Sequence, residues 1–259
     1  MKWFALETSS PRVSLAVGED DAVAREVAEE GDASTLVEPL FRKLRPDLDR
    51  VEACLIGRGP GSYNGLRVGY AFLKGLLCAR PAPVGEVPTL LLLAAQVADA
   101  RLGGAGRVLV VNNARRGEIH GVLARVAPES LAIEWEFTGG EAALRARLTP
   151  APAAVATWDF APAALATLGI TTVVRDFPRA GGLATAARRA GVARSGDLAR
   201  LEPAYVRPPV APPEGASALP RKDPNPRISS IFREQPSSSS MEDRRGESCR
   251  DSRLPTRRV

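Results

Sequence analysis

The sequence has few of the residues that metal sites and redox centres need. It contains one histidine, His120, and three cysteines, Cys54, Cys78 and Cys249, none at a metal-ligand spacing. A histidine-based metal site is therefore excluded, and we expect the thiols to be buried or incidental. Aromatic residues make up 5% of the chain and do not alternate with basic residues as they do in an RNA-recognition module.

The chain also lacks a hydrophobic run that could cross a bilayer. Its longest such run, around Leu90–Ala95, is far shorter than the roughly 20 apolar residues that a membrane helix needs. The N-terminal segment Met1–Glu7 reaches an acidic residue before the apolar core of a signal peptide could form. We therefore expect a cytoplasmic protein that does not contact membranes.

The net charge of +5 comes largely from the C-terminal tail. Residues 212–259 hold 10 of the 35 Lys and Arg and 7 of the 30 Asp and Glu, so the first 211 residues have a net charge of only +2. Proline, serine and arginine dominate this tail, and its few large apolar residues cannot offset the entropy lost on ordering. We expect a disordered, solvated tail, with contact to acidic partners or tRNA as the alternative.

The first 211 residues predict one order of elements twice. The first unit has strands at 2–6, 13–17 and 22–27, a helix that Ser34 would cap and that ends near residue 44, and then strand 53–56, helix 65–79, strand 83–87 and helix 89–100. The second has strands at 107–112, 118–125 and 131–137, then helix 141–148, strand 153–157, helix 162–168, strand 171–174 and helix 183–190. We predict an α/β fold of two lobes with mixed sheets, 1–102 and 103–211, facing each other across a cleft, and a tail at 212–259.

A glycine-rich loop joins the strand at 53–56 to the helix at 65–79. Its sequence, residues 57–69, matches neither a Walker A loop, nor Gly-x-Gly-x-x-Gly, nor a nucleophile elbow. Two interpretations stay open, a tight turn without a ligand and a loop that contacts a nucleotide or another anion. In the second case the candidate residues are Glu7, Gly59, Gly61, Ser62, Gly65 and Arg67.

No catalytic residue and no metal site is predicted. His120 lies in an alternating segment, where we interpret it as a strand side chain rather than a general base. A magnesium site made only of carboxylates would have to start from Glu7, which is a single acid.

The helix at 65–79 is apolar on nearly all sides, with Arg67 and Lys74 as its only charges. Such a helix is either buried in its own domain or covered by a partner, and the sequence leaves both open. Gly65 and Gly69 share a face, where small residues would let another helix approach. The candidate partner-binding residues on this helix and the one before it are Leu36, Leu40, Leu66, Gly69, Tyr70, Leu73 and Leu77.

Four segments resemble the TsaB (YeaZ) family: residues 4–16, the loop at 57–69, residues 113–118 and residues 203–207. The resemblance implies an actin-like ATPase fold, which is a duplicated ribonuclease H-like lobe. It implies a non-catalytic role in making threonylcarbamoyladenosine beside the anticodon of ANN-decoding tRNAs, as partner of the catalytic subunit TsaD and together with the ATPase TsaE. ATP and magnesium would act at the level of that complex, with none bound tightly by this chain, and tRNA would bind through the complex.

The resemblance also implies that helices 35–44 and 65–79 pack against the equivalent pair of TsaD, or of a second copy in a homodimer. Glu7, Asn64, Asn113 and His120 replace the residues that are usual in the family, which are Asp, Thr, Asp and Tyr. The changes at Glu7 and Asn113 argue against magnesium-nucleotide bound by this chain itself, and neither lies on the partner-binding helices. The alternative is a self-standing nucleotide hydrolase or glycoprotease-like peptidase that uses the Gly59–Ser62 loop, and the missing base and metal ligands oppose it.

Overall fold

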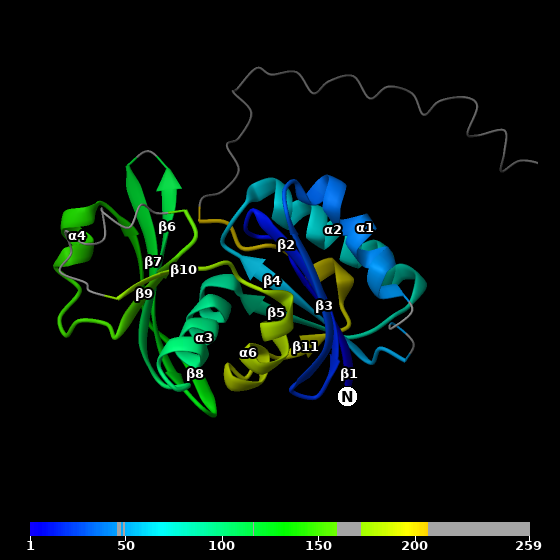
Figure 1. The fold of residues 1–259 in the computed structure, drawn as a ribbon. Coiled ribbons are helices and arrows are strands. Elements are labelled where there is room, and N and C mark those ends of the chain that lie inside the picture. Colours follow the sequence, from blue (N-terminus) through cyan, green and yellow to red (C-terminus); the bar gives the residue numbers. More distant parts are fainter. Residues whose placement is uncertain (46–47, 49, 116, 160–171, 207–259) are drawn as a thin grey trace, which may run out of the picture. The chain divides into compact units, whose positions relative to one another are not determined.

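The computed structural model describes residues 1–206 except 46–47, 49, 116 and 160–171 (Figure 1). The predicted helix at 162–168 and the predicted tail at 212–259 lie outside the described residues. The described residues belong to one compact unit, so the predicted boundary between lobes at residue 102 stays a prediction. Within the described part of the chain, no helix is both long and apolar enough to span a membrane.

The first sheet begins with the predicted antiparallel meander. Nearly continuous apolar runs make β1 and β2 strands that are buried on both faces, whereas β3 lies at the edge and is mostly exposed. β4 and β5 then join β1 in parallel, and β11 closes the far edge antiparallel to β5. The strands are β1 (Lys2–Glu7), β2 (Arg12–Glu19), β3 (Ala22–Glu30), β4 (Ala53–Gly59), β5 (Val84–Pro88) and β11 (Arg194–Ser195), in the order β11-β5-β4-β1-β2-β3.

The second sheet repeats this topology, as the sequence predicts. β6, β7 and β8 form an antiparallel meander, β9 pairs in parallel with β6, and β10 pairs in parallel with β9. The strands are β6 (Gly106–Arg115), β7 (Glu118–Ala127), β8 (Ser130–Gly139), β9 (Ala154–Thr157) and β10 (Val173–Arg175), in the order β10-β9-β6-β7-β8. Two mixed sheets that share one strand order are the duplicated ribonuclease H-like arrangement of the actin-like ATPase fold.

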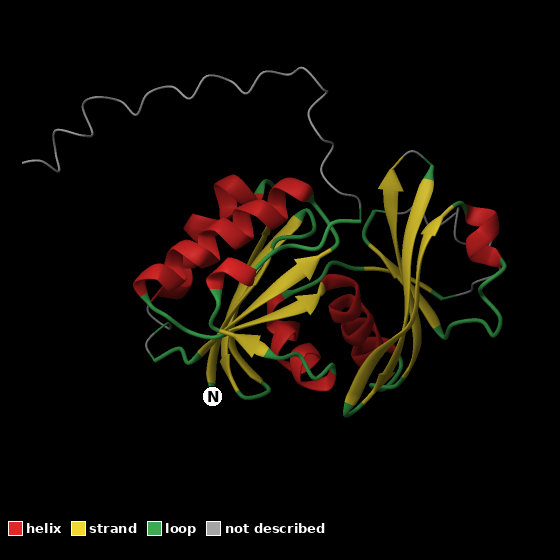
Figure 2. Cartoon of the chain, turned by 180° about the vertical axis from the view of Figure 1, so that it is seen from behind, coloured by secondary structure: helices red, strands yellow, loops and turns green. Residues whose placement is uncertain are grey.

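The helices separate and cover the two sheets in layers (Figure 2). α1 (Ala33–Leu44) and α2 (Tyr63–Ala79) cover one face of the first sheet, and α3 (Thr89–Arg101) and α6 (Leu183–Arg189) lie on its other face. α3 also packs on the second sheet, whose far face carries α4 (Glu141–Arg145). Three hydrophobic clusters fill the spaces between these layers.

The alternation of side chains along β1 shows how the layers share the sheet. Phe4 and Leu6 belong to the cluster under α1 and α2, while Trp3 and Ala5 belong to the cluster around α3. The cluster around α3 continues into Val108 and Val110 of β6, so α3 is enclosed by both sheets. Burial of both faces explains why the central strands have few polar residues.

The predicted cap of α1 is wrong by two residues. The helix begins at Ala33, and the cap is Asp32, whose carboxylate accepts hydrogen bonds from the backbone N–H of Ser34 at 2.8 Å and from its hydroxyl at 2.7 Å. Ser34 therefore lies in the first turn and donates to the cap. Both residue types favour the cap position, so the sequence alone does not choose between them.

Candidate functional site

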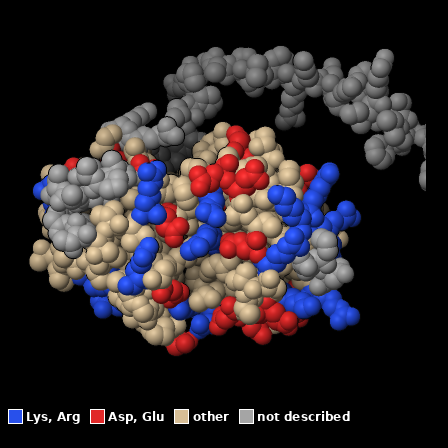
Figure 3. Space-filling view, in the orientation of Figure 1, with Lys and Arg blue, Asp and Glu red and all other residues tan. Residues whose placement is uncertain are grey.

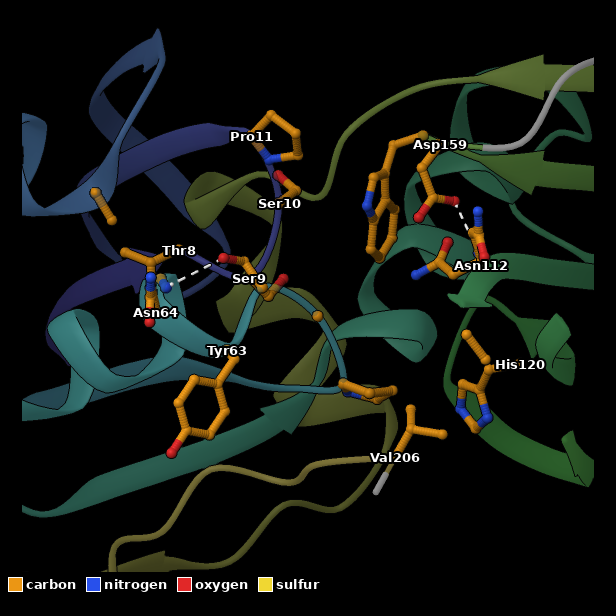
Figure 4. A pocket seen from close by; sticks show the side chains of 18 of the residues that line it. Thr8, Ser9, Ser10, Pro11, Tyr63, Asn64, Asn112, His120, Asp159 and Val206 are labelled. Atoms are coloured by element: carbon orange, nitrogen blue, oxygen red, sulfur yellow. Dashed lines mark hydrogen bonds between the residues drawn. The ribbon is translucent and has the colours of Figure 1, made fainter. Parts of the chain in front are cut away.

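A cleft of about 900 Å³ opens where the carboxyl ends of β1, β4, β6 and β9 meet. Loops at the carboxyl ends of parallel strands are the usual place for binding residues in open α/β sheets. Figure 4 shows Thr8, Ser9 and Asn64 on one wall and Asn112, His120 and Asp159 on the other. The lining comprises Thr8–Pro11, Gly31–Ala33, Pro60–Gly65, Asn112–Ala114, His120, Trp158, Asp159 and Val206.

The glycine-rich loop packs against the segment that follows β1, and this packing explains its glycines. A Cβ on Gly61 or Gly65 would lie 2.2 Å from the carbonyl oxygen of Ser9 or 2.1 Å from that of Thr8. A Cβ on Gly69 would lie 2.4 Å from Thr8 Oγ1. The sequence predicts that another helix could approach Gly65 and Gly69, but the segment after β1 occupies this face of α2.

Gly59 is needed for a second reason. Its φ of +95° lies in the region that side chains rarely adopt, and a Cβ there would be 2.7 Å from the carbonyl oxygen of Ala204. The backbone N–H of Ala204 in turn donates to the carbonyl of Arg58 at 2.8 Å. The loop and residues 203–206, the described part of another segment behind the family resemblance, thus meet in space.

Ser62 caps α2. Its hydroxyl accepts a hydrogen bond from the backbone N–H of Gly65 at 3.2 Å, and its own N–H donates to the carbonyl of Ser9 at 2.6 Å. Glycines that match a neighbouring segment, and a serine that caps a helix, are what a structural turn requires. The ligand-free interpretation of the loop accounts for these positions.

Glu7 is fully enclosed below the loop. One carboxylate oxygen accepts the backbone N–H of Ser9 at 2.6 Å, and the other lies 3.4 Å from the hydroxyl of Thr89. The Thr89 hydroxyl also accepts the N–H of Gly59 at 3.0 Å. Burial raises the pKa of Glu7, although these hydrogen bonds act in the opposite direction. Glu7 is thus held beneath the loop and is not part of the cleft lining.

The predicted nucleotide or anion contacts do not all reach the cleft. Gly61, Ser62 and Gly65 line it, whereas Glu7, Gly59 and Arg67 are not part of its lining. Within the described residues there is no group of three or more histidine, cysteine or acidic side chains that could hold a metal ion. Contact of this cleft with a nucleotide, with or without magnesium, stays a prediction.

The opposite wall comes from the second sheet. The Asp159 carboxylate accepts the backbone N–H of Asn113 at 3.1 Å. His120 lies on β7 as predicted and is 3% exposed, with Nδ1 2.9 Å from Thr138 Oγ1 and Nε2 3.4 Å from Glu136 Oε1. Burial lowers the pKa of His120, so its imidazole is held neutral.

Sequence reasoning missed three buried polar atoms in this lining. Thr8 Oγ1, Ser9 Oγ and Asn112 Oδ1 have no hydrogen-bond partner within the described part of the chain, and the same holds for Nε2 of His120. Buried polar groups are nearly always satisfied, so these atoms indicate where water or a ligand contacts the cleft. The available signal was their position directly after β1 and towards the end of β6.

The candidate partner-binding side chains lie mostly inside the chain. Leu36 is half-buried, and the other six are buried beneath α1 and α2. They hold these helices on the first sheet, and the outward face of α2 is formed instead by Arg67, Ala71, Gly75 and Cys78. Contact of the predicted residues with a partner stays a prediction.

A family model described as TsaD, tRNA N6-adenosine threonylcarbamoyltransferase, matches residues 30–198. The chain belongs to this family. Within the TsaD family, its similarity to curated relatives supports the TsaB resemblance that the sequence motifs indicate. The Escherichia coli (strain K12) tRNA threonylcarbamoyladenosine biosynthesis protein TsaB is 30% identical over 127 residues, which cover 46% of this chain and 53% of the relative.

The Bacillus subtilis (strain 168) protein of the same name is 27% identical over 143 residues, covering 50% of this chain and 61% of that protein. The chain thus spans little more than half the length of these curated relatives. Among solved structures, YeaZ from Pseudomonas aeruginosa matches with a TM-score of 0.62 at 22% identity, covering 79% of this chain and 99% of YeaZ.

A second structure, described as an uncharacterized protein with similarity to peptidase YEAZ from Pseudomonas aeruginosa, matches with a TM-score of 0.63 at 21% identity. The match covers 80% of this TsaD-family chain and 99% of that protein's chain. At these identities the two structures show the shared fold, in agreement with the strand order of the two sheets.

Proposed function

We propose that this chain is a non-catalytic subunit required for threonylcarbamoyl transfer to adenosine next to the anticodon of ANN-decoding tRNAs. It acts by binding and stabilising the catalytic subunit TsaD. One observation carries the proposal: the TsaD family model covers residues 30–198 of the chain. The curated relatives named TsaB support the same process.

The geometry of the cleft opposes a self-standing hydrolase or peptidase. The Ser62 hydroxyl caps α2, and the neutral His120 is bonded to Thr138, so the two are not arranged as a nucleophile and its base. Glu7 is enclosed and does not line the cleft. ATP and magnesium are then supplied by the other subunits, TsaD and the ATPase TsaE, and tRNA binds through the complex.

The outward face of α2 is the surface that suits a partner helix. Ala71, Gly75 and Cys78 are exposed and small, and a Cβ on Gly75 would meet nothing within 4 Å. Small side chains allow two helices to pack closely. Burial of this face against TsaD, or against a second copy when the chain is alone, would cover a helix whose only charged residues are Arg67 and Lys74.

A charge placed on this face tests the proposal. Gly75→Glu has open space and replaces a poor helix former, so the chain should fold as stably as before. Co-purification with TsaD, and tRNA modification by the reconstituted complex, should fall at least about tenfold, because an unpaired charge would be buried in the interface. Leu73→Glu is unsuitable because it would bury a charge in the chain's own core.

The matched control is Ala143→Glu, on the exposed surface of α4 at the other side of the molecule. It should leave co-purification and modification unchanged. If Gly75→Glu behaves like this control, α2 is not the docking surface. If purified chain alone hydrolyses ATP or peptide, the alternative function replaces the proposal. Measuring the size of the chain in solution with and without TsaD shows whether it forms a homodimer when it is alone.

A further inference from the structure

The fold assembles a small aromatic and basic cluster that is not visible in the sequence. Tyr63, the first residue of α2, and Tyr205, near the end of the described chain, have ring centroids 5.0 Å apart with an interplanar angle of 41°. Arg67, one turn along α2, donates to the Tyr63 hydroxyl at 2.8 Å, and its guanidinium carbon lies 5.3 Å from the Tyr63 ring centroid. Tyr63, Arg67 and Tyr205 are called the tyrosine–arginine cluster below.

The cluster lies at the mouth of the cleft and faces solvent. Tyr63 lines the cleft and is 43% exposed, and in Figure 4 its hydroxyl points away from Asn112 and His120. Val206, which also lines the cleft, is 36% exposed. These are two of the four large apolar side chains that the described residues expose. An exposed aromatic ring beside a recess is a surface that a flat ligand can cover.

The hydrogen bond from Ala204 to Arg58 holds the cluster in place. It ties the segment that carries Tyr205 to the loop that starts α2. The Arg67 side chain is exposed, and Glu202 is the acidic residue that acts on the Tyr205 ring electrostatically. On the face of the molecule drawn in Figure 3, basic and acidic side chains are intermixed.

The chemistry of the cluster fits an unpaired nucleotide. Bases of single-stranded RNA stack on exposed aromatic rings and guanidinium planes, and a nearby arginine can contact the phosphate. A stable protein interface needs about 800 Å² on each partner with an apolar centre. Tyr63 and Val206 alone supply much less apolar surface than that.

We propose that the tyrosine–arginine cluster binds an unpaired nucleotide of a single-stranded RNA loop, with the base on the tyrosine rings and the phosphate next to Arg67. The inference rests on the proposed function, because a tRNA anticodon loop presents such nucleotides to the complex. It adds that this subunit contacts the RNA directly, through a surface at the start of α2 that meets the outward face of this helix at Arg67.

The test is binding of a fluorescently labelled anticodon stem-loop RNA to the full chain, measured by anisotropy, with a fully paired RNA duplex as the comparison. The stem-loop should bind more tightly than the duplex. Tyr63→Ala should weaken binding of the stem-loop about tenfold, and Tyr63→Phe, which keeps the ring, should retain most of the affinity. Arg67→Ala should reduce the slope of log affinity against log salt concentration by about 1.

Arg145→Ala removes an exposed arginine of α4 and is the control, expected to match the unmodified chain. Circular dichroism confirms that each variant is folded. The inference is overturned if the chain does not bind the stem-loop, or if Tyr63→Ala binds it as the control does. Loss of co-purification with TsaD in Tyr63→Ala, with RNA binding unchanged, would assign the cluster to a protein interface.

The two proposals fail separately. If Tyr63→Ala leaves RNA binding unchanged while Gly75→Glu still disrupts the complex with TsaD, the RNA contact is wrong and the subunit role stands. If Gly75→Glu leaves the complex intact while Tyr63→Ala loses RNA binding, the RNA contact stands and the proposed docking surface is wrong.

Discussion

α2 and α3 are both apolar helices that follow a parallel strand of the first sheet, yet they have different surroundings. From Thr89 to Ala98 every residue of α3 is buried except Gln96, because both sheets and α6 pack around the helix. α2 buries only the side that faces the first sheet and α1, and its outward side is exposed. Apolar composition alone therefore does not distinguish a central helix from a surface helix.

The size of the apolar residues distinguishes the two cases. α3 has large side chains in consecutive positions, Leu90–Leu93, so any orientation would bury some and expose others unless both sides were covered. In α2 the large residues Leu66, Tyr70, Leu73 and Leu77 share one side, and the outward residues are mostly small. α3 thus connects the two sheets, whereas α2 leaves one side exposed to solvent.

The largest expected effect on stability comes from a cavity at α3, between the two sheets. Leu92 of α3 is fully buried, so Leu92→Ala should lower the free energy of unfolding by about 3 kcal/mol. Because α3 packs on both sheets, they should unfold in one transition. Urea denaturation followed by circular dichroism and tryptophan fluorescence measures both quantities. Leu76→Ala, at a half-buried position of α2, should cost much less, and equal costs would contradict the comparison.

The sequence predicts the sheets and helices well because their periodicity is local. The two meanders and the helices at residues 65–79 and 89–100 follow from alternation and apolar runs. Features that depend on distant contacts could not be predicted. The fit of Gly69 to Thr8, the contact of Tyr205 with Tyr63, and the short β11 all join residues that are far apart in the chain.

The candidate site was predicted only in part for the same reason. The glycine loop supplies one wall, and its motif was visible in the sequence. The opposite wall, with Asn112 and Asp159, comes from the second sheet and becomes part of the site only when the sheets pack together. The choice of Asp32 over Ser34 as the cap is a local competition that residue preferences do not resolve.

The second effect tests the inner side of α2. A methyl group at Gly69 would lie 2.4 Å from Thr8 Oγ1, and Thr8 is buried, so neither side can move freely. Gly69→Ala should destabilise the chain by about 2 kcal/mol through overpacking, despite the better helix propensity of alanine. Thermal and urea unfolding measure the change. A neutral or stabilising result would show that the segment after β1 moves to make room for the added methyl group.

The third effect depends on pH and tests the polar contact between the starts of the two helices. Glu7 contacts Thr89, the first residue of α3, which in turn binds Gly59 of the loop before α2. Because burial raises the pKa of Glu7 above its ordinary value of 4.5, the folded chain binds a proton that the unfolded chain releases. The free energy of unfolding should therefore fall as pH rises from 4.5 towards the raised value.

Glu7→Gln replaces the carboxyl group with an amide, which does not titrate but can still accept a hydrogen bond from the N–H of Ser9. Its stability relative to the unmodified chain should increase with pH across that window and be similar below it. Urea denaturation at a series of pH values provides the comparison. Parallel stability curves for the two chains would show that Glu7 carries no shifted proton.

The smallest effect tests the outward side of α2. Gly75 is exposed, lies inside the helix and has no atom within 4 Å of an added Cβ. Gly75→Ala should stabilise the isolated chain by about 0.5–1 kcal/mol, because glycine loses more backbone entropy than alanine in a helix. Gly69→Ala and Gly75→Ala make the same change six residues apart in one helix. Opposite signs in urea unfolding would show that α2 is filled on its inner side and open on its outer side, whereas destabilisation by both would mean that the outward side is already covered in the free chain.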